Sequence, residues 1–354
     1  MSLDAWSPRY PAPLRSGARI AVTAPSSGVQ APLHRRLDIV IGHLRAQGFE
    51  VEEGDCLRSE QHSASAPADL RAAELTRLLL RDDIAAIIPP WGGELAIELL
   101  DRLDWTALQA AARPKWLLGY SDTSTLLVPI TLRLGWATAH GPGLMDLAPG
   151  QADHLTRNVM AALFSSAGSQ FVQRQSSHWQ LKWTDFADVP DTTYQLTEPT
   201  HWRPLEGADP VQFSGRLIGG CIDTLMHTAG TPFGDVRSFI RHNHATGTGT
   251  VLYLENAEQS PTSLVRALHR LRWAGWLDGL SGLLLGRSAA TDKPGPLQLR
   301  YADAVRSALA GLRCPVLMDV DIGHCPPQMV LINGAIGQVQ WTRADGGRIT
   351  QLLA

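Results

Sequence analysis

Cysteine is scarce in this sequence, and its few thiols are not paired by spacing. The four cysteines are scattered along 354 residues without the pattern of a disulfide framework. Such usage is typical of reduced thiols, so we expect a cytoplasmic protein. The four are Cys56, Cys221, Cys314 and Cys325.

Three further features are missing. No apolar run approaches the ~20 residues that span a bilayer. Residues 1–6 lack the basic and apolar segments of a signal peptide. The net charge is −3, and no block of lysine and arginine offers an electrostatic footprint for nucleic acid. We therefore expect neither a membrane nor a nucleic-acid polymer as a partner.

The composition is that of an ordinary globular protein, with 44% hydrophobic and 18% charged residues. A chain of 354 residues is long for one core, which favours two domains. In the first half, apolar runs that suit strands alternate with segments of helical periodicity. We predict strands over 19–24, 49–51, 84–88, 116–118 and 137–140, and helices over 33–47, 66–80, 94–103 and 123–134.

This alternation predicts an α/β fold. Strands that alternate with helices form right-handed βαβ units, whose parallel sheet is covered on both faces. Loops after the carboxyl ends of such strands form the ligand crevice. The loops at 25–28, 89–93 and 119–123 should therefore share one edge of the sheet.

The texture changes between about residues 165 and 210, where polar residues and tryptophans replace the helical periodicity. Beyond this stretch we predict strands over 216–219, 251–254, 282–285, 316–319 and 330–332, and a helix over 260–273. The mixture indicates a smaller α/β or barrel-like second domain. We divide the chain into a domain at 1–165, a linker and tryptophan-bearing insert at 166–210, and a second domain at 211–354.

The most informative motif is Gly-Tyr-Ser-Asp at 119–122, where a short apolar strand is followed at once by a helix. The arrangement places Ser121 on a sharp strand-to-helix turn, where its hydroxyl is exposed as a nucleophile. The first free N–H groups of the helix can receive a developing oxyanion. The motif departs from Gly-x-Ser-x-Gly at its last position, so helix capping is the alternative role for this serine.

Two glycines directly after a predicted strand strengthen the nucleophile hypothesis. Gly92 and Gly93 supply a backbone that can approach a ligand and direct an N–H group at it. Together with the N–H of Asp122 they would form an oxyanion hole. The alternative is a tight turn between strand and helix.

A base and a carboxylate come from the second half of the chain. His324 lies between Gly323 and Cys-Pro-Pro, in a loop between two apolar strands, where an imidazole can move protons near neutral pH. Glu255 closes a buried strand, which is costly for a carboxylate unless it is paired. It could orient His324 as the third member of a Ser–His–carboxylate set. Glu258 could do the same, or cap the helix that begins near residue 260.

A rival hypothesis places a divalent metal on Asp319, Asp321, His324 and Glu255, with Ser121 holding substrate. Their spacing matches no metal motif. The glycine-containing stretches at 25–28 and 215–220 lack a complete nucleotide-binding fingerprint. We expect no metal and no cofactor.

Six motifs, in this order, resemble those of the serine LD-carboxypeptidases and the microcin C self-immunity carboxypeptidases. They run through nearly the whole chain, from residue 19 to about residue 335. They are Ala-Pro-Ser-Ser at 24–27, Trp-Gly-Gly-Glu at 91–94, Gly-Tyr-Ser-Asp at 119–122, Gly-Arg-Leu-Ile-Gly-Gly at 215–220, Tyr-Leu-Glu-Asn at 253–256 and Gly-His at 323–324.

The resemblance implies a Ser–Glu–His triad at Ser121, Glu255 and His324, with an oxyanion hole near Gly93 and Asp122. It also implies a homodimer without a metal. The implied fold is a flavodoxin-like N-terminal domain joined to a C-terminal domain of mixed, barrel-like β structure, with the site between them.

The resemblance leaves two substrate classes. LD-carboxypeptidases remove the terminal D-alanine from the murein tetrapeptide, whereas the immunity branch hydrolyses the bond between a peptidyl aspartate and a modified nucleotide. The insert at about 170–210 resembles the loop of the immunity branch whose aromatic side chain stacks on the nucleobase, a part for Trp179, Trp183 or Trp202. Three departures stand against this branch: Cys221 where many relatives have asparagine, Gln259 where a lysine contacts substrate, and the Trp-Gly-Gly-Glu loop.

We therefore expect a serine carboxypeptidase that acts on a small peptide or a peptidyl-nucleotide conjugate. The alternatives are a murein tetrapeptide LD-carboxypeptidase and a binding protein on a degenerate enzyme scaffold. A free carboxylate on the substrate would need a cation, for which Arg216, Arg203 and Lys115 are the candidates. Substrate contacts are predicted for Trp91, Glu94, Trp183, Arg216 and Glu258.

Overall fold

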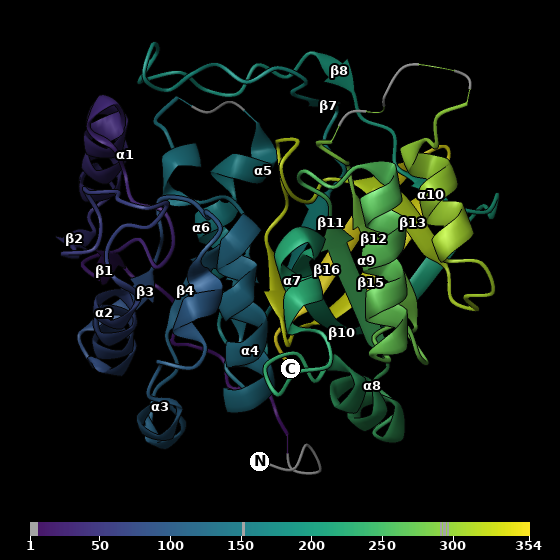
Figure 1. Cartoon of the computed structure of the whole chain (residues 1–354), viewed down its shortest axis with the longest axis horizontal. Coiled ribbons are helices and arrows are strands. Elements are labelled where there is room, and N and C mark those ends of the chain that lie inside the picture. Colours follow the sequence, from purple (N-terminus) through teal and green to yellow (C-terminus); the bar gives the residue numbers. More distant parts are fainter. Residues whose placement is uncertain (1–5, 151–152, 291, 293–294, 296) are drawn as a thin grey trace.

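The computed structural model describes residues 6–354 except 151–152, 291, 293–294 and 296. Two sheets stand side by side, one built mainly from the first half of the chain and the other from the second half (Figure 1). The two-domain α/β architecture predicted from the sequence is confirmed in this arrangement of a parallel-rich sheet and a mixed sheet.

The first sheet has six strands in the order β14-β5-β4-β3-β1-β2. Its five sequential strands are parallel, and β14 pairs antiparallel with β5. The strands are β1 (Arg19–Val22), β2 (Glu50–Glu53), β3 (Ile84–Ile87), β4 (Trp116–Gly119), β5 (Thr138–His140) and β14 (Leu331–Asn333). The helices of this half are α1 (His34–Ala46), α2 (Ala68–Leu80), α3 (Trp105–Ala110), α4 (Ser124–Leu134), α5 (His154–Arg157) and α6 (Val159–Leu163).

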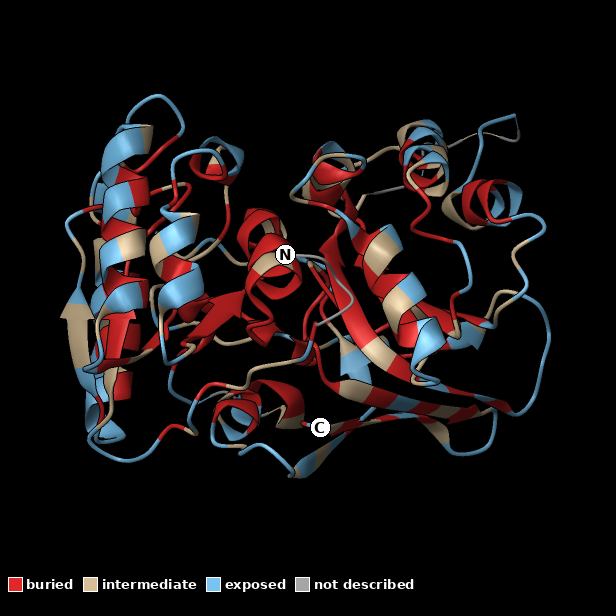
Figure 2. Cartoon of the chain, turned by 90° about the horizontal axis from the view of Figure 1, so that it is seen from below, coloured by how far each residue is buried: buried red, intermediate tan, exposed pale blue. Residues whose placement is uncertain are grey.

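Helices cover both faces of this sheet, as predicted. Ile20 and Val22 of β1 belong to the core that includes α1 and α6, whereas Ala21 between them belongs to the core of α2 and α4. Successive strand residues point to opposite faces, so one short run of apolar residues supplies both cores. In Figure 2 the strands are mostly buried, and the outer helices are exposed on their solvent side.

The second sheet has eight strands in the order β6-β16-β15-β10-β11-β12-β13-β9. Strands β10 to β13 are parallel and the outer four pair antiparallel. The strands are β6 (Gln170–Arg174), β9 (Arg203–Pro204), β10 (Val211–Cys221), β11 (Thr250–Glu255), β12 (Gly282–Gly286), β13 (Val316–Val320), β15 (Ile336–Thr342) and β16 (Gly346–Leu352). The helices are α7 (Ile222–Thr228), α8 (Val236–Ala245), α9 (Pro261–Trp273) and α10 (Tyr301–Ala308).

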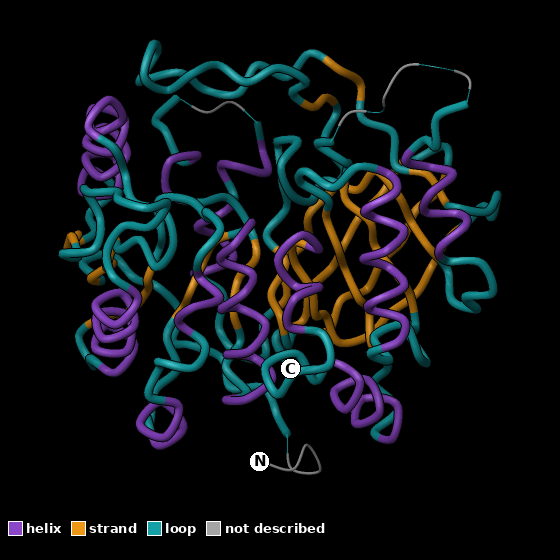
Figure 3. The backbone as a smooth tube through the Cα atoms, viewed as in Figure 1, coloured by secondary structure: helices purple, strands orange, loops and turns teal. Residues whose placement is uncertain are grey.

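The segment between the two halves reaches across the molecule. It supplies β6 and β9 to the second sheet and a two-stranded ribbon of β7 (His178–Trp179) and β8 (Glu198–Pro199). Between β7 and β8 a long loop extends along the top of Figure 3 toward α1. There the buried Arg36 donates hydrogen bonds to the carbonyls of Pro190 (3.0 Å) and Thr192 (2.7 Å). The insert is therefore fastened to the first half.

Two local predictions differ from the structure. The helix predicted over 94–103 is only a 3-10 turn, Ala96–Leu99. Its entry is tied to the sheet edge, because the N–H groups of Leu95 and Ala96 donate to side chains of Ser26 and Asp122. The strand predicted at 330–332 forms as β14 but completes the first sheet rather than the second, because its partner is β5.

Within the described part of the chain, no helix is long and apolar enough to cross a membrane. The predicted meeting of three loops at one sheet edge is confirmed. The Ser27 N–H donates to the Gly92 carbonyl (3.2 Å), and the Ser26 hydroxyl donates to the Asp122 carboxylate (2.6 Å). The loops after β1, β3 and β4 therefore come together where the parallel strands end, and the second sheet packs beside β14 and α4.

Candidate active site

Ser121 occupies a strained turn between β4 and the 3-10 helix Ser121–Thr123 that leads into α4. Its φ of +57° lies in the left-handed region, which costs a non-glycine residue on the order of 1–3 kcal/mol. The buried Asp122 carboxylate fixes this turn, since it accepts hydrogen bonds from Ser26 Oγ, Thr125 Oγ1 and the Ala96 N–H. The hydroxyl is thereby held at the top of the sheet, as in a nucleophile elbow.

His324 and Glu255 complete a chain of contacts with this serine. His324 Nε2 lies 3.1 Å from Ser121 Oγ, and His324 Nδ1 lies 2.8 Å from Glu255 Oε2. Ser121 comes from the first sheet, whereas Glu255 ends β11 and His324 lies in the loop between β13 and β14. The arrangement therefore exists only where the two sheets face each other. Glu255 is 1% exposed, and the His324 side chain is 23% exposed.

Two glycines let the carboxylate approach the histidine loop. A Cβ at Gly323 would lie 2.3 Å from Glu255 Oε2, and a Cβ at Gly286 would lie 2.9 Å from Glu255 Cβ. Gly323 also has a φ of +88°, which side chains rarely adopt. The Gly-His pair in the sequence is thus explained by a close approach as well as by a turn.

Replacing Gly323 with alanine is expected to displace His324 from Glu255. The added methyl group collides with a buried carboxylate, and a displacement near 1 Å lowers turnover by about 100-fold. The left-handed φ also lowers the free energy of unfolding by about 1–3 kcal/mol. Steady-state kinetics and thermal melting measure the two effects.

Gly311→Ala is the matched control for that variant. Gly311 has a φ of +78° but no atom within 4 Å of an added Cβ, so it reproduces the strain without the collision. We expect Gly311→Ala to lose stability alone. Wild-type turnover in Gly323→Ala would show that the close approach is not needed.

The charges of the pair stabilise each other. Burial lowers the pKa of His324, but the charge and hydrogen bond of Glu255 outweigh it, so the pKa is raised above 6.5. Burial by itself would raise the pKa of Glu255, but the charge and hydrogen bond of His324 outweigh burial, so the pKa of Glu255 is lowered. The ring of Tyr120 meets that of His324 edge-on, with centroids 4.9 Å apart, and supports its orientation.

The double glycine packs directly against the turn at Ser121. A Cβ added to Gly92 would lie 2.7 Å from the backbone nitrogen of Asp122 and 2.7 Å from Ser121 Cβ. Gly93 has a φ of +137°, and a Cβ there would meet Ser27 Oγ at 2.4 Å. Asp122 is the second residue of its 3-10 helix, so its N–H has no partner inside that helix. The backbone of both segments can therefore approach an oxygen bound at Ser121.

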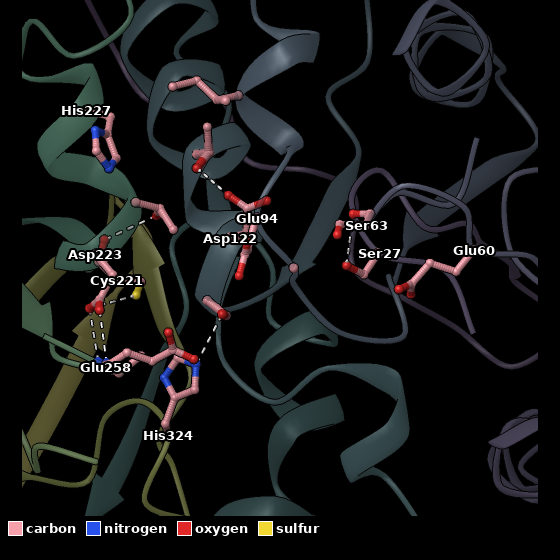
Figure 4. Close-up of a pocket in the computed structure, with 16 residues that line it drawn as sticks. Ser27, Glu60, Ser63, Glu94, Asp122, Cys221, Asp223, His227, Glu258 and His324 are labelled. Carbon is pink, nitrogen blue, oxygen red and sulfur yellow. Dashed lines mark hydrogen bonds between the residues drawn. The ribbon is translucent and has the colours of Figure 1, made fainter. Parts of the chain in front are cut away.

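A cavity of about 640 Å³ opens in front of Ser121 and His324 (Figure 4). Of the predicted substrate contacts, Glu94 and Glu258 line it. Its described lining contains carboxylates but neither lysine nor arginine, so its interior is acidic. Ser27 of the Ala-Pro-Ser-Ser motif also lines the cavity, together with residues that no sequence motif marked: Glu60, Ser63, Ile97, Thr125, Asp223, Thr224, His227 and Ala257.

Asp223 is the lining residue that a sequence signal could have revealed, because it stands in the first turn of the helix after the Gly-Gly end of β10. Its carboxylate accepts hydrogen bonds from the N–H groups of Ala257 (3.0 Å) and Glu258 (2.9 Å). Asp223 thus holds the loop after Glu255 in place.

Three other predicted contacts lie away from this cavity. Trp91 Nε1 donates to the Ser27 carbonyl, and its ring packs on the core of the first sheet. Arg216 donates to the carbonyls of Gly334 and Ala354. Trp183 is half exposed and packs against Phe186 and Tyr194 in the insert.

The remaining candidate cations and tryptophans are also held elsewhere. Arg203 pairs with Asp319, and Lys115 is buried at the amino end of β4. Trp202 Nε1 donates to the Asp321 carboxylate, and the Trp202 ring belongs to a hydrophobic core formed largely by the second sheet. None of these residues lines the described cavity, and Trp179 does not line it either.

The four residues of the rival metal hypothesis are not brought together. Asp321 is buried against Arg287 and accepts a hydrogen bond from Ser176, while Asp319 pairs with Arg203. Within the described ranges, the one group of three metal-ligating side chains is Cys221, Glu255 and His324.

Comparisons with known proteins cover both halves of the chain. A family model described as the LD-carboxypeptidase N-terminal domain matches residues 20–141, and one described as the LD-carboxypeptidase C-terminal domain matches residues 214–339. A putative carboxypeptidase of Streptomyces coelicolor is 30% identical over 96% of this chain and 95% of its own length.

Two further relatives carry more specific names. The probable murein peptide carboxypeptidase of Bacillus subtilis is 26% identical over 92% of this chain and 89% of its own. The microcin C7 self-immunity protein MccF of Escherichia coli is 26% identical over 92% of this chain and 91% of its own. A solved structure of MccF with glutamyl sulfamoyl guanosine matches with a TM-score of 0.81 at 23% identity, covering 96% of this chain and 98% of that one. This likeness shows the fold.

Proposed function

This chain belongs to the LD-carboxypeptidase family, and on that premise we propose that it is a serine-type carboxypeptidase with Ser121, His324 and Glu255 as its catalytic triad. The observation that carries the proposal is the continuous contact from Ser121 Oγ through His324 to Glu255, at 3.1 and 2.8 Å. The strained φ of Ser121 supports the same role, because strain of this kind persists where the surrounding structure enforces it.

The mechanism follows from the direction of these contacts. His324 Nε2 takes the proton of Ser121 Oγ as the oxygen attacks a carbonyl carbon, and Nδ1–H donates to Glu255. Glu255 thereby fixes the tautomer and stabilises the imidazolium. The N–H groups near Gly93 and Asp122 hold the oxyanion, each contributing about 3–4 kcal/mol. The imidazolium then protonates the leaving group, and water repeats the sequence on the acyl-enzyme.

The proposed substrate is a small peptide or a peptidyl (aspartyl)-nucleotide conjugate, cleaved at its C-terminal bond. A cavity of about 640 Å³ suits a ligand of this size. The exposed carboxylates of Glu94 and Glu258 favour an ammonium group on the substrate, such as a free amino group. The described lining holds no lysine or arginine that could bind the free carboxylate of a leaving amino acid. This weighs against a substrate that ends in D-alanine.

The names of two relatives favour a second candidate, a murein tetrapeptide LD-carboxypeptidase. One is the probable murein peptide carboxypeptidase of Bacillus subtilis, and the other is the murein tetrapeptide carboxypeptidase of Pseudomonas aeruginosa, 26% identical over 72% of this chain. The homodimer, the cytoplasmic location and the division at residues 165 and 210 stay predictions.

One experiment separates these functions. Wild type and Ser121→Ala are incubated with the murein tetrapeptide ending in D-alanine and, separately, with aspartyl sulfamoyl adenosine, and the products are identified by mass spectrometry. Free aspartate and sulfamoyl adenosine from wild type alone would support the proposal, whereas D-alanine would support the murein alternative. Saturable binding without any product, and without labelling of Ser121 by a fluorophosphonate, would indicate a binding protein.

The rate of the reaction is expected to fall as the pH is lowered, and the midpoint of this fall, the acid limb of the pH–rate profile, should lie above pH 6.5. His324 acts as a base only when neutral, and its pKa is raised by Glu255, so protonation removes the base at a higher pH than for an unperturbed histidine. The rate of fluorophosphonate labelling between pH 5 and pH 9 measures this limb without a natural substrate. A limb at or below pH 6.5 would contradict the assigned coupling.

A further inference from the structure

We propose that Cys221, Glu255 and His324 form a site for a thiophilic divalent cation, Zn²⁺, whose binding switches the serine nucleophile off. The proposal that Zn²⁺ binds here does not depend on any enzymatic activity, whereas the proposal that Zn²⁺ inhibits the serine rests on the proposed function.

The backbone places the three ligands together. Cys221 ends β10 and Glu255 ends β11, and the two residues are register partners on adjacent parallel strands. The Cys221 N–H donates to Ser124 Oγ at 3.0 Å, which fixes the thiol over the start of α4. Figure 4 shows Cys221 and His324 on the same side of the cavity. One ligand atom from each of the three residues lies within 4.8 Å of those of the other two.

A second observation points to a ligand at this place. Glu255 Oε1 is buried and accepts no hydrogen bond from a nitrogen or oxygen donor in the described structure, although Oε2 is bonded to His324; the donor beside this carboxylate is the Cys221 thiol. An S–H group is a weak donor, so the buried oxygen is poorly compensated, and a cation between it and the thiolate would remove that cost. Asp223 adds negative charge nearby, since its Oδ2 lies 3.5 Å from Cys221 Sγ.

The donor set selects the metal. Zn²⁺ takes thiolate, imidazole and carboxylate ligands in tetrahedral sites, and a set of three leaves one position for water. A thiolate disfavours Mg²⁺ and Ca²⁺, which prefer oxygen ligands. Cys221 and Glu255 are both buried, and the cavity at Ser121 provides the entry path for the ion.

Zinc binding prevents His324 from acting as a base, and the protons it displaces can be accounted for. The thiol of Cys221 loses its proton to solvent as the zinc–sulfur bond forms, so one proton leaves for each ion bound. If zinc takes Nε2 of His324, the lone pair that accepts the serine proton is lost directly. If zinc takes Nδ1, the ring proton moves to Nε2, which then donates and can no longer accept a proton from Ser121. The metal-free protein is the active form in either case.

The test compares the full chain with Cys221→Ser and with Cys314→Ser, a control that removes a thiol outside the cavity. Each protein is stripped with EDTA, and Zn²⁺ binding is measured by competition with a chromophoric chelator. We expect one ion per chain for wild type and Cys314→Ser, and at least about tenfold weaker binding for Cys221→Ser. Cys221→Ala guards against a serine oxygen acting as a ligand, and melting curves without metal check that the variants fold.

The second readout is the rate at which a fluorophosphonate labels Ser121. Zn²⁺ is expected to slow labelling in wild type and Cys314→Ser but not in Cys221→Ser, EDTA to restore it, and Mg²⁺ to have no effect. Equal Zn²⁺ affinity in wild type and both Cys221 variants would overturn the site, as would no binding in wild type. Binding that depends on Cys221 supports the site even if Ser121 is never labelled, a result that would count against the proposed function alone.

Discussion

Replacing Ser121 with alanine is expected to lower kcat by about 10⁶-fold, the loss measured when the nucleophile of such a triad is removed in another protease. No other hydroxyl is positioned 3.1 Å from His324 Nε2 in the described structure, so no neighbour can substitute. Folding should be unaffected, because the serine hydroxyl bonds only to His324 there. Turnover and fluorophosphonate labelling should disappear together while the melting temperature stays within about 2 °C of wild type, since such a change alters stability by only about 0.5 kcal/mol.

Ser27→Ala is the matched control for this variant. Ser27 lines the same cavity, but its hydroxyl only approaches the Ser63 carbonyl at 3.5 Å. We expect a change of less than about tenfold in kcat/KM, the size of a lost neutral hydrogen bond. Substantial activity in Ser121→Ala, or activity of wild type that EDTA abolishes, would reject the serine mechanism and revive catalysis by a metal. The inhibitory zinc site predicts the opposite response, in which EDTA preserves activity.

Replacing Glu255 with glutamine is expected to lower kcat by about 10⁴-fold, by analogy with the measured effect of the equivalent acid-to-amide change in a serine protease triad. The glutamine amide can donate a hydrogen bond to Nδ1, which would place the ring proton on Nε2 and leave no acceptor for the Ser121 proton. The variant also loses the charge that raises the pKa of His324. Fluorophosphonate labelling should slow in parallel, while the protein remains folded because the two side chains have the same shape.

Glu258→Gln tests the other carboxylate that the sequence offered for this role. Its side chain is exposed and lines the cavity, and the carboxylate bonded to His324 is that of Glu255. We expect Glu258→Gln to change KM for a substrate with an ammonium group, with kcat nearly unchanged. If Glu258→Gln and Glu255→Gln lost kcat equally, Glu255 could not be assigned as the orienting group.

The sequence predicted those parts of the structure that depend on local pattern. The short apolar runs predicted at 19–24, 84–88 and 116–118 became β1, β3 and β4, because each buries side chains on both faces of a parallel sheet. The Gly-Tyr-Ser-Asp motif predicted the turn at Ser121, because a strand that passes at once into a helix leaves few backbone conformations open. The three predicted loops share one edge because parallel strands end on the same side.

Other features had no local signal. The stretch 94–103 has good helical composition, but its first amides are bonded to Ser26 and Asp122, and the helix is limited to one 3-10 turn. Arg216 looked available for a substrate carboxylate, yet its guanidinium is used by two backbone carbonyls near the C-terminus. Cys221 gave no spacing signal, because its partners Glu255 and His324 are distant in sequence.

The sequence by itself therefore determined most of the elements, the sharp turn at Ser121 and the identities of a serine, a carboxylate and a histidine. Only the tertiary structure decided that these three meet and that Asp319 and Asp321 do not join them. Ser121 and His324 are 203 residues apart: Ser121 follows β4 of the first sheet, whereas His324 lies in the loop that leads from β13 of the second sheet to β14 of the first. Local periodicity fixes which residues are buried within an element, but the packing of the two sheets against each other sets which side chains come within hydrogen-bonding distance.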